Sequence, residues 1–311
     1  MDKKLTAPVL FMIFNRPSTT QLVFDEIRKA KPAKLFVAAD GPRQGKEGEI
    51  EKCQAARDIV KQVDWNCQVK TLFRDKNLGS KIAGTLAINW FFENVEEGII
   101  LEDDCLPSQS FFWFCQELLE RFRNDSRVMH IAGMTYVEKK NNLNNYSYHF
   151  VRVGGIWGWA TWRRAWKLYD IEMKTWPEAK KENILKNLFA GEPRLSSLYN
   201  RWFSEIYGNT GAMDCWDYQW TYAKLINNSI NIMPAKNLIT NIGFGDESCH
   251  TSDKKNQFAG LKKYELNFPL KHPKFVVVDR EFNSQNLNFV AGNKFIGRLK
   301  GLKKRISKIL K

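Results

Sequence analysis

The chain has 311 residues, of which 43% are hydrophobic, 13% aromatic and 26% charged, and this balance excludes a disordered, collagen-like or coiled-coil protein. Lys and Arg outnumber Asp and Glu by 48 to 34. The resulting net charge of +14 predicts an anionic partner, such as a nucleotide, a nucleic acid or an acidic membrane.

The sequence shows neither a secretory leader nor a membrane span. The apolar run over residues 8–14 is short and ends in Asn15-Arg16-Pro17. No stretch reaches the ~18 to 20 apolar residues that a spanning helix needs. Six cysteines without a C-x-x-C pair, beside only four histidines, make a zinc ribbon or a dense disulfide framework improbable. We therefore expect a cytoplasmic protein with reduced thiols.

The first hundred residues alternate between apolar runs and longer segments with helical spacing. The runs cover residues 8–14, 34–40, 68–73 and 98–104, and the third spacer, residues 82–92, is apolar on most sides and is expected to be well buried. This order predicts a βαβαβαβ arrangement with a parallel sheet and helices on both faces. Ligands of such sheets bind beyond the carboxyl ends of the strands.

After residue 105 the pattern changes. It predicts a helix over residues 110–122, a strand over 128–132 and a helix that opens near 215 and continues to 225. Eight of the 11 tryptophans lie between residues 157 and 220. No linker or low-complexity stretch separates the two halves, which favours one domain over residues 1–290.

The C-terminal residues 291–311 are expected to form a separate tail. Its last 18 residues, from 294 onward, contain eight Lys and Arg and no acid, and their apolar residues recur at steps of four and three. This pattern predicts a basic amphipathic helix on an anionic membrane surface. A solvated helix and nucleic-acid binding are the alternatives. The tail lacks aromatic or Gly-Arg interleaving, and we expect no nucleic-acid partner.

Three acids, Glu102, Asp103 and Asp104, directly follow the fourth predicted strand. Adjacent carboxylates at a strand end lose hydration and repel one another unless a cation or hydrogen-bond donors compensate. Hard oxygen ligands select Mg²⁺ or Mn²⁺, and such an ion would bridge to a diphosphate. The alternative interpretation is a solvated acidic turn.

Polar residues also end the three earlier strands, so that all four sets converge on one sheet edge. We expect Asn15 and Asp40 to contact a base or ribose, and arginines and a lysine to meet phosphates. Each of these motifs is also an ordinary turn or helix entry. No G-x-G-x-x-G follows the first strand, and residues 79–85 lack the P-loop lysine, which disfavours dinucleotide redox and P-loop ATPase functions. The predicted nucleotide-binding residues are Asn15, Arg16, Asp40, Arg43, Asn77, Lys81, Glu102 and Asp103.

The motifs PVLFMIFNRP, KLFVAADGPR, RDKNLGS and above all EGIILEDDCLPS resemble those of bacterial nucleotide-sugar glycosyltransferases of the GT-A fold, distantly related to the N-acetylglucosaminyltransferase I group. The resemblance covers about residues 8 to 255. It implies that the acidic triplet binds ribose and metal, with Asp104 as the direct ligand of a divalent ion and Glu102 and Asp103 nearer the nucleoside. It also implies that residues 1–105 form the nucleotide-binding half and residues 106–290 the acceptor half.

Asp217 is the candidate catalytic base, in the sequence CWDYQW. Sugar transfer with inversion needs a carboxylate that takes the proton of the acceptor hydroxyl, and a ring-lined site raises the pKa of such a carboxyl toward the working range. The alternative is that Asp217 only decorates a helix start while Trp216 and Trp220 pack in the core.

Two further segments supply weaker candidates. Trp157, Trp159 and Trp216 are predicted to present ring faces to acceptor sugars, although core packing is equally compatible with them. Glycines 243 and 245 would let a loop fold over a substrate. His250 follows them, and the resemblance implies a role as metal ligand beside Asp103 and Asp104, or as donor to a phosphate.

Together these patterns predict a metal-dependent glycosyltransferase on the inner face of the cell membrane. It would move a sugar, with inversion, from a nucleoside diphosphate, expected to be UDP, to a hydroxyl of a surface glycan or lipid-linked glycan. A sugar nucleotidyltransferase would share the sheet, the metal and the nucleotide. A basic membrane- or nucleic-acid-binding module is the non-enzymatic alternative.

Overall fold

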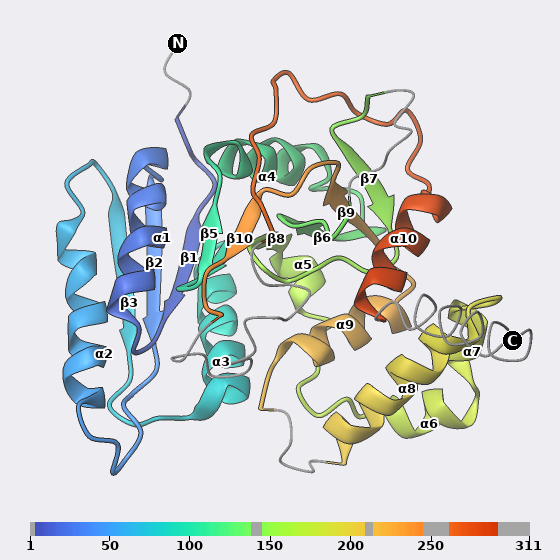
Figure 1. Cartoon of the computed structure of the whole chain (residues 1–311), viewed down its shortest axis with the longest axis horizontal. Helices are drawn as coiled ribbons and strands as arrows, with labels where there is room; N and C mark the ends of the chain where they lie inside the picture. The colour runs from blue at the N-terminus through green and yellow to red at the C-terminus, as the bar shows by residue number, and fades with distance from the viewer. Residues whose placement is uncertain (1–3, 138–144, 209–213, 245–260, 292–311) are drawn as a thin grey trace, which may run out of the picture.

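The computed structural model describes residues 4–137, 145–208, 214–244 and 261–291. Its centre is an eight-stranded sheet with the strand order β3-β2-β1-β4-β8-β6-β9-β7, which runs across the molecule in Figure 1. The strands come from both halves of the sequence. β1 to β4 belong to the first 105 residues, and β6 to β9 to the part that follows.

The first half has the predicted alternation of strands and helices. It contains β1 (Val9–Ile13), α1 (Pro17–Ala30), β2 (Lys34–Ala39), α2 (Glu49–Asp58), the 3₁₀ turn η1 (Ile59–Gln62), β3 (Gln68–Phe73), α3 (Gly79–Asn94) and β4 (Glu97–Glu102). β1 pairs in parallel with β2 and with β4, and β2 pairs in parallel with β3. The βαβαβαβ prediction is confirmed, with each strand within two residues of its expected bounds.

The second half adds strands of both directions. β6 pairs in parallel with β9, whereas β8 runs antiparallel to β4 and β6, and β7 antiparallel to β9. The α/β class with a mixed, mostly parallel sheet is therefore confirmed. The strands are β5 (Cys105–Pro107), β6 (Val128–Ala132), β7 (Tyr148–Val151), β8 (Trp159–Trp162), β9 (Ile230–Pro234) and β10 (Ile239–Asn241); the helices are α4 (Gln109–Arg121), α5 (Arg163–Trp166), α6 (Trp176–Lys181), α7 (Ile184–Leu188), α8 (Pro193–Tyr207), α9 (Asp217–Ile226) and α10 (Arg280–Val290).

Alternation along the strands builds a core on each face of the sheet, because successive side chains of a strand point to opposite faces. In β1, Val9 and Phe11 join a cluster with buried residues of α1, α2 and α4. Leu10 joins a second cluster with buried residues of α3, α5 and α9. The sheet is thus covered by helices on both faces, as predicted.

Helix α3 is less buried than its sequence predicts. Ile88 and Phe91 are fully buried, whereas Ile82 and Leu86 are 40% and 38% exposed. α3 lies against one face of the sheet, so its outer side faces solvent. Apolar residues on that side therefore have no partner layer.

A third cluster lies beside the sheet, where α6, α7 and α8 form a small helical group at the lower right of Figure 1. Tyr222 and Leu225 of α9 and Leu287 of α10 join the same buried cluster. These contacts hold the helical group against α9 and α10. The residues on the inner side of the helical group can therefore lie near the carboxyl ends of the strands, where ligands are expected to bind.

The strand order reverses between β1 and β4. The chain proceeds from β1 to β2 to β3 in one direction and then returns through α3 to place β4 on the other side of β1. α1 and α2 pack on one face of the sheet, and α3 packs on the other. In open α/β sheets this switch point opens a crevice beyond the carboxyl ends of the strands. The loops after β1 and β4 are therefore the expected ligand site.

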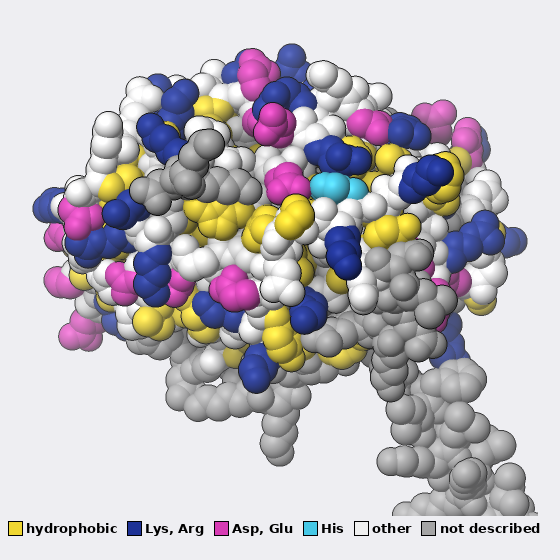
Figure 2. Space-filling model, turned by 90° about the horizontal axis from the view of Figure 1, so that it is seen from above, with side chains coloured by type: hydrophobic (Ala, Val, Ile, Leu, Met, Phe, Trp, Pro, Cys, Tyr) yellow, Lys and Arg dark blue, Asp and Glu magenta, His cyan; other side chains and the backbone are white. Residues whose placement is uncertain are grey.

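Within the described ranges, no helix is both long and apolar enough to cross a bilayer. The predicted tail, residues 294–311, lies outside those ranges. On the face shown in Figure 2, Lys and Arg side chains are interspersed with Asp and Glu. The described part of that face therefore offers no large patch of one sign, which nucleic-acid binding would favour.

Candidate functional site

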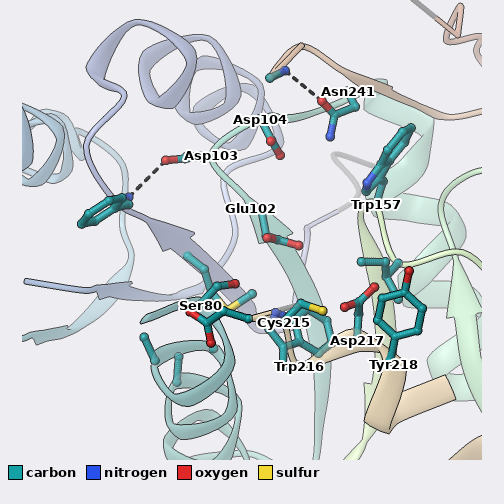
Figure 3. Close-up of a pocket in the computed structure, with 18 of the residues that line it drawn as sticks. Ser80, Glu102, Asp103, Asp104, Trp157, Cys215, Trp216, Asp217, Tyr218 and Asn241 are labelled. Atoms are coloured by element: carbon teal, nitrogen blue, oxygen red, sulfur yellow. Dashed lines mark hydrogen bonds between the residues drawn. The ribbon is translucent and has the colours of Figure 1, made fainter. Parts of the chain in front are cut away.

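A pocket of about 830 Å³ lies at the carboxyl ends of β1, β2 and β4. This is within the usual range for small-ligand sites. One wall comes from the strand ends of the first half, and the opposite wall comes from the loop 153–157, the start of α9 and parts of α8 and α10. Figure 3 shows Glu102 and Asp104 across this space from Asp217, whereas Asp103 points away from it.

A cluster of ion pairs connects the end of β1 to the end of β4 at the switch point. The Arg16 guanidinium, just after β1, pairs with both Asp103 and Asp104, just after β4, and its contact with Asp104 Oδ2 is 3.2 Å. Asp103 Oδ2 also accepts the N–H of Phe14 at 3.1 Å. Burial raises the pKa of the Asp103 carboxyl, while Arg16 opposes that rise. Arg16 was predicted to meet phosphate; in this structure its charge compensates the two acids.

Glu102 lies between Asp104 and Asp217 in Figure 3 and lines the pocket. Burial raises the pKa of its carboxyl well above the ordinary value, and the negative charges of Asp104 and Asp217 raise it further. Glu102, Asp104 and Asp217 therefore lie in the same pocket, and their carboxyl groups would attract a hydroxyl or a cation.

Asp40, which directly follows β2, forms hydrogen bonds that connect the end of this strand to the start of α3. Its carboxylate accepts the backbone N–H groups of Gly41, Leu78 and Gly79 and the side-chain amide of Asn77. Burial nevertheless raises its pKa. Asp40 and Asn77 line the pocket. However, their hydrogen bonds are made with each other, with Gly41 and with the start of α3, at the rim of the pocket. The sequence did not predict these bonds.

Arg43, Glu49 and Asn15 form a second polar cluster at the same edge. Arg43 pairs with Glu49 through its guanidinium and its backbone N–H, and Asn15 Nδ2 donates to Glu49 Oε1 at 2.9 Å. Arg43 lines the pocket, whereas Asn15 is not among the lining residues. Asn15 therefore supports Arg43 through Glu49 in this structure, and a direct contact with a base or ribose remains a prediction.

Asp217 is the first residue of α9 and lines the pocket. The Cys215 thiol hydrogen-bonds to its carboxylate. The negative charge of Asp217 also contributes to the raised pKa of the Tyr136 and Tyr218 hydroxyls, although burial is the larger cause in both. The carboxylate thus faces a partly aromatic wall, the environment that the base hypothesis requires.

The three candidate tryptophans differ in position. Trp157 is partly buried, lines the pocket and packs edge-on against Phe244 at a centroid distance of 5.7 Å. Trp216 lines the pocket but is only 3% exposed. Trp159 has no exposed surface and stacks between His130 and Trp216 in the core, so the prediction that it offers a face to a sugar is wrong. Its place in β8, between β4 and β6, accounts for its burial.

Lys81 is not among the lining residues of the main pocket. Its backbone N–H and that of Ser80 donate to the carboxylate of Asp214, at 3.2 and 2.9 Å. Asp214 therefore satisfies the first turn of α3, where an anion is favourable. A contact of the Lys81 ammonium group with a phosphate remains a prediction.

The described residues do not fit a divalent-metal site as they stand. No group of three or more His, Cys, Asp or Glu able to hold an ion occurs in the described ranges. Asp103 is committed to Phe14 and Arg16, and the guanidinium of Arg16 already compensates Asp104. His250 lies outside the described residues. The metal therefore remains a prediction.

Several pocket residues were missed from the sequence. Tyr199 and Trp202 come from α8, Asn286 and Leu287 from α10, and Asp214 precedes α9. In sequence, the aromatic residues of α8 look like an ordinary amphipathic helix. Asp214 directly precedes the CWDYQW motif, and this position was the one feature of the sequence that could have indicated it as a pocket residue.

No protein-family model matches the sequence, and no curated protein matches it. Among solved structures, mouse xyloside xylosyltransferase 1 in its apo form has 11% identity and a TM-score of 0.33, over 71% of this chain and 81% of that one. 4-Diphosphocytidyl-2C-methyl-D-erythritol synthase from Anaerococcus prevotii has 10% identity and a TM-score of 0.31, over 52% and 75%.

A third structure, UDP-glucose pyrophosphorylase complexed with UDP-glucose, has 12% identity and a TM-score of 0.27. The similarity covers 47% of this chain and 62% of that one. Similarities of this size do not assign a reaction. The function is therefore inferred from the pocket itself.

Proposed function

We propose that this chain is a glycosyltransferase that moves a sugar from a nucleoside diphosphate to an acceptor hydroxyl. The observation that carries the proposal is one pocket at the β1/β4 switch point with two unlike walls. One wall holds the Arg16, Asp103 and Asp104 cluster, and the opposite wall holds Asp217. Such a division suits a transfer between two different substrates.

The donor is assigned to the wall formed by the first half. Arg74 lines this side beside the ion-paired Arg16 and Arg43, and guanidinium groups are well suited to phosphate oxygens. Asp40 and Asn77 shape the rim between β2 and α3 at the same edge. A diphosphate bound here would bring its sugar toward Glu102 and Asp217.

Asp217 acts as the base in the proposed reaction. Its carboxylate takes the proton of the acceptor hydroxyl, and the hydroxyl oxygen forms a bond to the anomeric carbon of the sugar. The bond from that carbon to the diphosphate breaks, and the nucleoside diphosphate leaves with the electron pair. Attack opposite to the leaving group inverts the anomeric configuration.

Several finer assignments belong to the same proposal. They are a UDP sugar as donor, a surface or lipid-linked glycan as acceptor, and attachment of the protein to the inner membrane face through residues 294–311. A divalent ion at Asp104 is also proposed, but no step is derived through it because the described donor set does not form its site.

The test is a thermal-unfolding screen against UDP sugars and other nucleotide sugars, with and without Mn²⁺, followed by product analysis. A donor that binds only the folded chain raises the melting temperature, by an amount that grows with its concentration. Release of a nucleoside diphosphate from the donor, together with a glycosylated acceptor, supports the proposal.

Release of pyrophosphate would instead identify a sugar nucleotidyltransferase, which could use the same edge of the sheet. Failure of every nucleotide sugar to raise the melting temperature would remove both enzyme functions. In that case, salt-dependent retention of oligonucleotides or anionic vesicles would favour the basic binding module.

A further inference from the structure

The loop between β7 and β8 passes along the pocket wall with two adjacent glycines, Gly154 and Gly155, followed by Ile156. A Cβ on Gly154 would lie 2.7 Å from His130 Cδ2, and one on Gly155 would lie 2.6 Å from Met134 Sδ. Only glycine therefore allows the loop to approach the core this closely.

Two buried polar side chains hold the carbonyl groups of these glycines. Lys224 of α9, 1% exposed, donates from Nζ to the oxygen of Gly154 at 3.2 Å. His130 of β6, fully buried, contacts the oxygen of Gly155 through Nε2 at 2.8 Å. Fully buried Lys and His side chains are costly, and these two are satisfied by the loop.

The tautomer of His130 follows from its other partner. The indole N–H of Trp220 can only donate, and it lies 3.2 Å from Nδ1 of His130. Nδ1 must therefore accept, and Nε2 carries the proton that is donated to Gly155. Burial lowers the pKa of His130 well below its ordinary value, which keeps the ring neutral in this arrangement.

The direction of the loop N–H groups follows from the planar peptide. The bonds from 154 to 155 and from 155 to 156 are both trans, so each N–H points opposite to the carbonyl of the same peptide. Since both carbonyls point to Lys224 and His130 in the core, the N–H groups of Gly155 and Ile156 point away from it. Neither N–H donates to an acceptor within the described parts of the chain.

We propose that the backbone N–H groups of Gly155 and Ile156 form a two-donor site for one oxygen of the bound ligand, with His130 and Lys224 as positioning residues. The inference rests on the proposed function for the identity of the ligand. The oxygen belongs either to the transferred sugar or to the diphosphate that carries it. Two aligned donors are a common device for holding an oxygen that bears negative charge.

The position of the donors agrees with this role. Glu102 and Asp217, both acids, line the same pocket as Gly155 and Ile156. Acids alone would repel the oxygens of a sugar phosphate. The loop N–H groups supply positive dipoles that would offset this repulsion.

The test uses the full chain labelled with ¹⁵N glycine, isoleucine and tryptophan, titrated with UDP and with UDP-N-acetylglucosamine. Amide signals of Gly155 and Ile156 that move with both probes indicate a diphosphate oxygen. Amide signals that move only with the nucleotide sugar indicate a sugar oxygen. Either result supports the site. Movement of the Trp157 indole signal without these two amides would overturn it.

If neither probe moves any pocket signal, the proposed donor is wrong, and hydrogen exchange of the free protein decides the inference. Amides that face an open pocket without an acceptor exchange rapidly, whereas protected amides of Gly155 and Ile156 would refute the geometry.

A matched pair of variants tests the positioning role. His130→Gln keeps a donor near the place of Nε2, whereas His130→Leu removes it. We expect the leucine variant to raise the KM for the donor about fivefold or more, and glutamine to restore most of it, with kcat changed less. Equal KM values for the two variants, in proteins with the same melting temperature, would contradict a positioning role for His130.

Discussion

The two walls of the pocket are built in different ways. The first-half wall uses charged side chains that are paired with one another, as Arg16 is with Asp103 and Asp104. The second-half wall uses aromatic rings and backbone groups, held from behind by the buried side chains of His130 and Lys224. This difference is the basis on which we propose a nucleotide at the first wall and the reacting hydroxyl at the second.

This contrast has a physical origin. Strand ends of a parallel sheet place loops and charged residues at one edge, where opposite charges compensate the loss of water. The second wall comes from a loop and helices that pack over the sheet, so its polar groups are buried. His130 and Lys224 are each hydrogen-bonded to a loop carbonyl. A change at either wall should therefore have its own measurable effect.

The largest expected effect is on catalysis at the second wall. Asp217→Asn keeps the size of the side chain but removes the base, and we expect kcat to fall about 10³-fold. Donor affinity, measured by calorimetry, should stay within a factor of two because the proposed donor site is at the first wall. Asp58→Asn, on the exposed side of α2, is the control. Substantial activity in the Asp217 variant would place the base elsewhere.

The next effect tests the ion pairs of the first wall. Arg16→Met leaves Asp103 and Asp104 close together without their compensating charge, and we expect the free energy of unfolding to fall by about 3 kcal/mol. Donor binding should weaken as well. Arg28→Met removes a pair with Asp64 in which both partners are exposed, so its urea midpoint should barely change. Equal midpoints for the two variants would show that the cluster is not a structural element.

The smallest effect concerns pH and Lys224 of the second wall. Burial lowers the pKa of Lys224 from 10.5 to about 7, although Asp217 on the same helix opposes the shift, and His130 across from it stays neutral. The unfolded chain therefore binds one more proton than the folded chain between about pH 7 and 10.5. Across that range the stability contributed by this site increases with pH.

Lys224→Met removes this contribution. The difference in unfolding free energy, wild type minus variant, should rise by about 1.4 kcal/mol for each pH unit above 7. Urea unfolding of both proteins at pH 7.5 and 9 measures it. Parallel pH profiles for the two proteins would mean that Lys224 keeps an ordinary pKa in the folded chain.

The two walls also differ in how far the sequence predicted them. The strands and helices of the first half followed from alternation and helical spacing, and the acids after β4 were placed at the correct edge. The pairing of Arg16 with those acids was not predicted, because the strand order that brings β1 beside β4 is a property of the whole sheet. The hydrogen bonds of Asp40 to the start of α3 were missed for the same reason.

The sequence by itself determined the strands β1 to β4 and β6, since local periodicity reports burial residue by residue, whereas β7, β8 and β9 were not predicted. It also singled out Asp217 and the 102–104 acids by chemistry. Only the tertiary structure decided that Trp159 is core while Trp157 lines the pocket, because both lie in one aromatic run and differ only in what packs over them. It likewise decided the direction of the loop N–H groups, since long-range contacts with His130 and Lys224 orient those peptides and no local pattern encodes them.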